Sequence, residues 1–282
     1  MKVIETIHAM RSDVLAARAK GKTVGLVPTM GALHAGHVSL IDAARAQCHY
    51  VVATIFVNPT QFAPTEDLGA YPRTPEADLK ACRDHGADAV FTPGVAEMYP
   101  PEALTDVRVR TISERLCGHD RPVHFGGVCT VVAKLFNIIP ADKAFFGQKD
   151  FQQTVVIRRM AADLNFPVQI VVCPTVREAD GLAMSSRNVY LTPEQRRQAP
   201  ALYGALQFAR DLIARSHPPA AEVAQAMRRH LASAAPDGQI DYVALVNPST
   251  LADVQTTDAP VALALAVRLG RARLIDNVIV EG

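Results

Sequence analysis

Short apolar runs alternate with a helical segment near the start of the chain. Residues 23–29 and 50–57 are apolar and rich in β-branched side chains over almost their whole length, which is typical of strands buried on both faces of a parallel sheet. Residues 36–48, between them, carry apolar side chains at helical spacing. This order of strand, helix and strand predicts a βαβ unit and restricts the chain to an α/β fold.

The same alternation continues through the next hundred residues. Helices are predicted at about 5–20, 74–86, 127–137 and 150–164, and strands at 88–92 and 168–173. We therefore expect a Rossmann-like, doubly wound parallel sheet in a domain formed by residues 1–175. Ligands of such sheets bind beyond the carboxyl ends of the strands.

Beyond about residue 175 the pattern changes. Two Ala-rich amphipathic helices, at 193–215 and 219–234, precede three runs typical of antiparallel strands, at 240–246, 260–269 and 273–280. We expect a smaller C-terminal α+β domain formed by residues 176–282, which acts as a lid. The polar segment 174–181, bounded by Pro and Gly, suits a hinge.

Charge and hydropathy exclude several classes of protein. The 282 residues include 29 Lys+Arg and 28 Asp+Glu, for a formal net charge of +1, which excludes the broad basic surface of a nucleic-acid binder. No stretch approaches the roughly 20 apolar residues of a membrane span, and residues 1–22 carry scattered charges rather than a signal peptide's apolar core. We expect a cytoplasmic protein with no nucleic-acid partner and no membrane partner.

The cysteines argue against a disulfide framework. Their number, five, is odd, and none forms a CxxC pair. We expect buried, reduced thiols rather than a cysteine zinc site.

Two histidines flank a glycine where the first buried strand passes into a helix, in the segment 28–37. Gly31 allows a tight turn, and Gly36 allows a ligand to approach the helix N-terminus, where free amides and the helix dipole favour phosphate. His34 and His37 add N–H donors that can follow a phosphate into a more negative transition state. The alternatives are half of a metal site and a pair of incidental surface histidines.

Two further segments carry phosphate-binding side chains. In residues 145–153 a turn led by Gly147 places Lys149 beside Asp150, which suits the N-cap of the helix at 150–164. In residues 180–188, Ser185, Ser186 and Arg187 supply compact donors and a guanidinium fork suited to phosphate oxygens. Alone, Lys149 would more often be a solvated surface lysine, and Ser-Ser-Arg would often only cap a turn; together the three segments indicate a site for an anion.

Neutral amides follow the second buried strand. Asn58 and Gln61 stand where substrate loops belong and can hold hydroxyl and carboxylate oxygens without an ion pair that would weaken a carboxylate nucleophile. Gln153, one turn into the later helix, is a candidate for the same pocket.

Taken together, these segments resemble the pantothenate synthetase, or pantoate–β-alanine ligase, family, a branch of the HxGH nucleotidyl-transferring Rossmann-like proteins. The matching motifs, in the family's order, are PTMGALHAGH (28–37), FVNPTQF (56–62), YPRT (71–74), RPVHFGGV (121–128), KLFNIIPADKAFFGQKDFQQ (134–153) and DGLAMSSRN (180–188).

The resemblance implies a two-step ligase. The pantoate carboxylate attacks the α-phosphorus of ATP, with Mg²⁺, to give pantoyl adenylate and pyrophosphate; the β-alanine amine then displaces AMP to give pantothenate. The resemblance also implies a homodimer. It assigns ATP contacts to Met30, Gly31, Ala32, Leu33, His34, Ala35, Gly36, His37, Gly147, Gln148, Lys149, Asp150, Val176, Met184, Ser185, Ser186 and Arg187.

The resemblance assigns further roles to individual residues. Gln61 and Gln153 are assigned to pantoate, and Gln61 is also assigned to β-alanine. We expect His34, His37, Lys149 and Arg187 to be catalytic. The family usually treats His37 as a proton donor, but pantoate is already ionised at pH 7, so we expect His37 to act chiefly by stabilising the phosphate.

Two positions depart from the family pattern, and other functions compete with the ligase. Val123 and Gln148 stand where glycine and glutamate are frequent, and Val123 bears on the loop that carries Arg121 and His124. The alternatives are another HxGH nucleotidylyltransferase, a tRNA-charging enzyme, which the missing basic excess argues against, and a non-catalytic nucleotide-binding protein on the same fold.

Overall fold

The computed structural model describes residues 1–64, 66 and 68–281. The chain divides into two compact units. The first consists of Met1–Glu114, Gly118–Gly147 and Val156–Pro174. The second consists of Arg115–Cys117, Gln148–Val155 and the chain from Thr175 onward.

A six-stranded parallel sheet forms the centre of the first unit, which confirms the predicted fold class. Its strand order is β1-β4-β3-β2-β5-β6. The strands are β1 (Lys2–Ile4), β2 (Val24–Thr29), β3 (Tyr50–Ile55), β4 (Ala89–Phe91), β5 (Lys143–Gly147) and β6 (Gln169–Cys173).

Two of these strands were not expected from the sequence. The segment 145–147, interpreted as a turn, is the end of β5, which pairs with both β2 and β6. The edge strand β1 pairs only with β4 among the described strands. Short strands with few apolar residues have too little periodicity to be recognised.

Helices surround the sheet. The helices predicted for this part of the chain are present, and the short α4 and α5 are additional. The elements are α1 (Ile7–Ala19), α2 (Ala35–Gln47), the 3₁₀ helix η1 (Pro59–Gln61), α3 (Pro75–Asp84), α4 (Val95–Met98), α5 (Cys117–Asp120), α6 (His124–Ile138), the 3₁₀ helix η2 (Gln148–Asp150) and α7 (Phe151–Asp163). A core between α2 and the central strands includes Val27, Ile41, Val51 and Phe145, all fully buried.

The strand order places a topological switch point at β2. From β2 the chain moves to β3 and β4 on one side, and later adds β5 and β6 on the other. The register pairs Thr29 with Ile55 and Leu26 with Ala144. Ligands of open parallel sheets bind at the carboxyl ends beside such a reversal, and Met30 and Gly147 stand at the ends of the two strands concerned.

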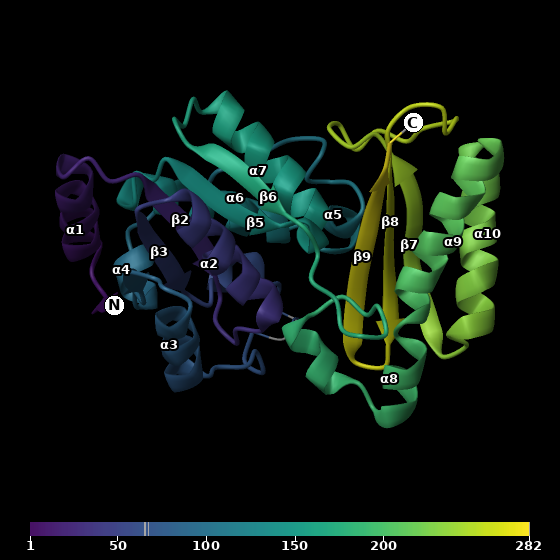
Figure 1. Cartoon of the computed structure of the whole chain (residues 1–282), viewed down its shortest axis with the longest axis horizontal. Coiled ribbons are helices and arrows are strands. Elements are labelled where there is room, and N and C mark those ends of the chain that lie inside the picture. The colour runs from purple at the N-terminus through teal and green to yellow at the C-terminus, as the bar shows by residue number, and fades with distance from the viewer. Residues whose placement is uncertain (65, 67, 282) are drawn as a thin grey trace. The chain divides into compact units, whose positions relative to one another are not determined.

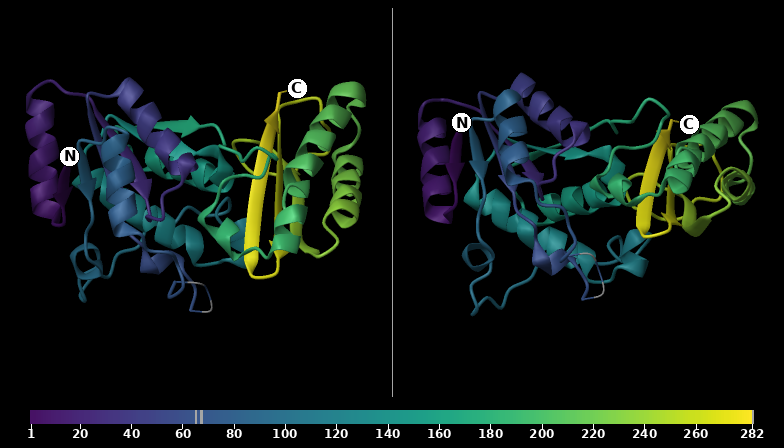
Figure 2. Two further views of the ribbon diagram at one scale, coloured as in Figure 1. Left: turned by 60° about the horizontal axis from the view of Figure 1, so that its bottom comes forward. Right: turned by 90° about the horizontal axis from the view of Figure 1, so that it is seen from below.

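The second unit is built on a three-stranded antiparallel sheet, as expected. The sheet is β7-β8-β9, and α9 and α10 pack against it through a core that includes Leu206, Met227 and Leu265 (Figures 1 and 2). The elements are the 3₁₀ helix η3 (Ser186–Tyr190), α8 (Pro193–Gln198), α9 (Ala201–Ser216), α10 (Ala220–Ala234), β7 (Gly238–Val246), β8 (Val261–Leu269) and β9 (Ala272–Val280).

The single helix expected at 193–215 is wrong. It is divided into α8 and α9, and Pro200 lies at the break. Proline has no N–H to donate to the carbonyl of Arg196, so the helical hydrogen-bond ladder is interrupted there.

The cysteines are free and buried, as the sequence predicts. Among the described residues, no helix combines the length and the apolar character that a membrane crossing requires.

Candidate functional site

The two motif histidines lie at the start of α2. His34 is the N-cap residue, and its Nδ1 accepts a hydrogen bond from the Gly36 amide at 3.1 Å. His37 Nδ1 accepts from the His34 amide at 3.5 Å, and the two ring centroids are 4.1 Å apart. A neutral imidazole whose Nδ1 accepts carries its proton on Nε2. Each ring is therefore an Nε2–H donor beside a helix N-terminus, which suits an anionic ligand.

The backbone geometry weakens the metal alternative for these histidines. Both Nδ1 atoms already accept backbone amides. In the described parts of the chain, no three His, Cys, Asp or Glu side chains are grouped to hold a metal ion.

A buried carboxylate holds the turn before α2. Asp78 on α3 is 2% exposed, and its oxygens accept from the amides of Ala32 at 2.9 Å and Leu33 at 2.8 Å. These amides are therefore engaged within the protein. No motif in the sequence singled out Asp78. Its role depends on contacts with Leu33 and Ala32, which precede it in the chain by 45 and 46 positions.

The amides after β3 form a network. Asn58 is 1% exposed; its Nδ2 donates to Gln61 Oε1 and to the Gly127 carbonyl, each at 3.1 Å. Its Oδ1 accepts from the hydroxyls of Thr60 and Tyr99, each at 2.9 Å. Burial raises the pKa of the Tyr99 phenol, so it remains a donor. Asn58 is thus saturated by the protein itself.

This network fixes the orientation of the Gln61 amide. Because Gln61 Oε1 accepts from Asn58, its Nε2 presents the donors, and one approaches Met30 Sδ at 3.1 Å. Thioether sulfur is a weak acceptor. An oxygen of a substrate can replace it at little cost.

Helix α6 packs closely against η1. A Cβ at Gly127 would lie 2.4 Å from the Thr60 carbonyl carbon and 2.5 Å from the Gln61 amide nitrogen. Only glycine allows this approach of backbone to backbone. The position of Gln61 therefore depends on a glycine in another helix.

The loop before α6 and the first residue of α6 contact the backbone carbonyl of Gln61. His124 Nδ1 lies 3.0 Å from that carbonyl oxygen, and Arg121 makes a two-pronged ion pair with Glu66 at 2.7 and 2.8 Å. Burial alone would raise the pKa of the Glu66 carboxyl, but hydrogen bonds and charge from Arg121 outweigh it and hold that pKa below its usual range. Val123 has φ −91°, a conformation open to any residue, so the family's glycine is not required there.

The second unit holds the predicted lysine segment. Asn277 on β9 donates to the carbonyls of Gln148 and Lys149 at 2.9 and 3.0 Å, which anchors η2. Lys149 Nζ lies 3.6 Å from Asp150 Oδ1. Asp150 directly precedes α7, although as the last residue of η2 rather than in an open turn.

Two adjacent glutamines at the start of α7 have different environments. Gln152 is 5% exposed; its Oε1 accepts from the Cys117 amide at 2.9 Å and its Nε2 donates to the Arg115 carbonyl at 2.6 Å. Gln153 is only half-buried. Gln152 therefore supports the fold, and Gln153 is the better candidate for a ligand.

The Ser-Ser-Arg segment starts a 3₁₀ helix. Ser185 Oγ accepts from the Arg187 amide at 3.3 Å and caps η3. The residues before it are anchored by Arg177, which pairs with Asp276 at 2.6 and 2.9 Å and lies 3.6 Å over the Tyr203 ring. The Met184 amide donates to the Val176 carbonyl at 3.0 Å.

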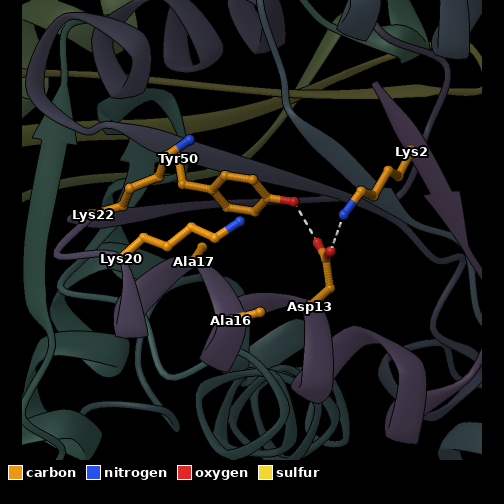
Figure 3. Close-up of a pocket in the computed structure, with 7 residues that line it drawn as sticks. All are labelled: Lys2, Asp13, Ala16, Ala17, Lys20, Lys22 and Tyr50. Atoms are coloured by element: carbon orange, nitrogen blue, oxygen red, sulfur yellow. Dashed lines mark hydrogen bonds and ion pairs between the residues drawn. The ribbon is translucent and has the colours of Figure 1, made fainter.

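A pocket at the amino ends of the strands is a different kind of feature. Figure 3 shows the Tyr50 hydroxyl and the Lys2 ammonium both directed at the Asp13 carboxylate. Burial and the contact with Asp13 raise the pKa of Tyr50, so the phenol stays protonated. These groups satisfy one another on the edge of the sheet away from the switch point. We assign them a structural role.

The predicted residues thus fall into both units. The first unit brings together Met30, the histidine segment, Asn58, Gln61 and Gly147 at the carboxyl ends of β2, β3 and β5. The second unit contains Gln148, Lys149, Asp150, Gln153, Val176, Met184, Ser185, Ser186 and Arg187. Sequence patterns missed Asp78, Tyr99 and Asn277, which act on these residues from other elements.

Comparisons with known proteins agree on one family. The model of the family described as pantoate-beta-alanine ligase matches residues 2–279. A pantothenate synthetase of Moorella thermoacetica is 54% identical over 100% of this chain and 99% of its own length, and one of Thermotoga neapolitana is 52% identical over 99% of each.

Solved structures are similar over the same extent. The crystal structure of pantothenate synthetase from Thermus thermophilus superposes with a TM-score of 0.93 at 44% identity, covering 99% of each chain. A pantoate-beta-alanine ligase from Francisella tularensis, complexed with beta-gamma ATP and beta-alanine, gives a TM-score of 0.82 at 32% identity over 99% of this chain and 97% of that one.

Proposed function

The chain belongs to the pantoate–β-alanine ligase family, and we propose that it forms pantothenate through pantoyl adenylate with the residues described above. It is an ATP-dependent ligase that joins pantoate to β-alanine. The alternative of another HxGH nucleotidylyltransferase is not favoured. The observation that carries the proposal is the pair of Nε2–H histidines at the N-terminus of α2, beside the switch point of the sheet.

The first step brings one anion to another. A pantoate carboxylate oxygen attacks the α-phosphorus of ATP, and the bond to the leaving pyrophosphate breaks. His34 and His37 stabilise the growing charge with neutral N–H donors, while Lys149, Ser185, Ser186 and Arg187 supply further donors to the phosphates. No proton needs to be removed in this step, so the histidines are not required as bases. They can act as hydrogen-bond donors, and the backbone amides bound to Nδ1 fix the tautomer that donates from Nε2.

Pantoate is oriented by neutral groups. Gln61 donates from Nε2 to a pantoate oxygen in place of the Met30 thioether, and Gln153 contributes a second amide. Asn58 acts through Gln61 rather than by touching the substrate, because both the NH₂ group and the oxygen of its side-chain amide are already hydrogen-bonded within the protein. In the second step the β-alanine nitrogen attacks the acyl carbon, the bond to AMP breaks, and the amine loses a proton.

Magnesium fits this site as a companion of ATP. Mg²⁺ commonly binds through substrate phosphates and one or two carboxylates, and retains several waters. The described residues contain no group of three potential ligands, whereas the partly exposed Asp150 carboxylate stands beside Lys149. Asp150 would hold the ion, which neutralises phosphate charge when bound.

Family membership also supports a homodimer, which equilibrium sedimentation would test.

An exchange assay tests the proposed function. The purified protein should exchange labelled pyrophosphate into ATP only when pantoate is present, and release AMP in turnover only when β-alanine is added. A nucleotidylyltransferase would instead accumulate a stable nucleotide adduct without an amine. Folded protein that shows no pantoate-dependent exchange would disprove the proposal.

A further inference from the structure

The turn that leads into the motif histidines has an unfavourable backbone conformation. Gly31 has φ +83° and Ala32 has φ +51°. The left-handed region is unfavourable for a non-glycine residue such as Ala32. Successive amides in such a turn point to one side and form a concave anion site. An acceptor on those amides would stabilise the turn.

The Asp78 carboxylate is the anion in this site. Oδ2 accepts from the Ala32 amide at 2.9 Å, and Oδ1 accepts from the Leu33 amide at 2.8 Å and from the Thr74 hydroxyl at 3.0 Å. Hydrogen bonds to an ionised acceptor are about twice as strong as neutral ones. At 2% exposure, water competes little with them. We call these hydrogen bonds to the Asp78 carboxylate the clamp. The clamp joins α3 to the turn, and both belong to the first unit.

The turn leaves little room for a side chain next to the Asp78 carboxylate. A Cβ on Gly31 would lie 2.9 Å from Asp78 Oδ2 and 3.1 Å from Ile55 Cγ2. The glycine is therefore needed both for its positive φ and for the approach of the carboxylate. The turn and the carboxylate fit each other closely.

We infer that Asp78 is a positioning residue for adenylation, an inference that rests on the proposed function and deepens it. Through the turn, it sets where α2 starts, and so where His34 and His37 place their Nε2–H groups. It also accepts from the amides of Ala32 and Leu33. Without Asp78, these amides would attract a phosphate to the turn that precedes α2 rather than to the N-terminus of the helix. The ATP phosphates are thereby directed to the histidines and the helix end.

The primary test replaces Asp78 with asparagine, which has nearly the same shape. One carboxylate oxygen becomes an NH₂ group that faces a backbone amide, so the clamp is lost with little change in volume. We expect the KM for ATP to rise and the pantoate-dependent exchange rate to fall, each by about tenfold or more, because an ångström of misplacement can cost about 10²-fold. Glu76→Gln, at an exposed position of the same helix, is the matched control and should behave as the wild type.

A double-mutant cycle separates positioning from stability. Gly31→Ala disturbs the same contact from the other side, so its effect on kcat/KM for ATP should be less than additive with that of Asp78→Asn. A merely structural Asp78 would lower the melting temperature but leave the KM for ATP and the exchange rate per folded enzyme within about twofold of the wild type. That result would overturn the inference.

Two further outcomes are also decisive. If Asp78→Asn does not fold, Thr74→Val removes one of the three hydrogen bonds to the carboxylate; a raised KM for ATP supports the clamp, and an unchanged one refutes it. Failure of the proposed function itself is distinguishable, because the wild type would then show no exchange.

Discussion

Replacing His37 with alanine is expected to slow pantoyl adenylate formation by about 10²–10³-fold, or roughly 3–4 kcal/mol of transition-state stabilisation. The reason is the loss of one donor to a phosphate whose charge grows during the reaction. Pantoate-dependent pyrophosphate exchange under saturating substrates measures the effect. His8→Ala, at an exposed position of α1, should leave the rate unchanged.

His37→Gln distinguishes hydrogen bonding from proton donation. Glutamine can place an N–H near the position of Nε2 but cannot give up that proton. If His37 stabilises the phosphate, the glutamine variant should recover part of the rate that the alanine variant loses. A pH–rate profile that requires one protonated imidazole, and loses that requirement in His37→Gln, would contradict this assignment and restore the role of proton donor.

Gly127→Ala is expected to impair the binding of pantoate severely. The new Cβ would lie 2.4–2.5 Å from backbone atoms of Thr60 and Gln61, so η1 must move by roughly 1 Å to recover normal contact distances. A displacement of this size at Gln61 should lower kcat/KM for pantoate by about 10²-fold. Overpacking should also cost about 1–3 kcal/mol of stability.

The neighbouring glycine provides a matched control. A Cβ at Gly126, in the same helix, meets only Arg108 among the described residues, at 3.6 Å, which is ordinary contact. Gly126→Ala should keep normal pantoate kinetics and should not lower stability, since alanine suits a helical conformation better than glycine. Pantoate saturation curves and urea denaturation of both variants provide the comparison. Similar kinetics in the two variants would show that the close approach of Gly127 does not set the position of Gln61.

Much of the fold followed from local patterns in the sequence. The continuous apolar runs that became β2 and β3, and the antiparallel strands of the second unit, were predicted within a few residues. The strand β5 was missed because it is short and ends in a segment rich in turn residues. The break between α8 and α9 depended on one residue, Pro200, whose effect the periodic pattern of its neighbours concealed.

The candidate site divides in the same way. His34, His37, Gln61 and Lys149 stand in local motifs, so their chemistry could be inferred without a structure. Asp78, Gly127 and Asn277 contribute through contacts with segments far along the chain, which no local pattern encodes. For Asn58 the local pattern favoured a different kind of role. Its amide suits a substrate, yet its burial and its partners point to a role in orienting Gln61.

The buried thiols make the stability of each unit separately measurable. Thiolates, not thiols, react with alkylating reagents, and burial raises the pKa of Cys82 and of Cys129 to about 11. Burial also raises the pKa values of Cys48 and Cys173. Labelling of these four thiols, all in the first unit, therefore reports the opening of that unit, whereas labelling of Cys117 reports the opening of the second. Mass spectrometry of a labelling time course in dilute denaturant would reveal whether the two units unfold as one cooperative body or in succession.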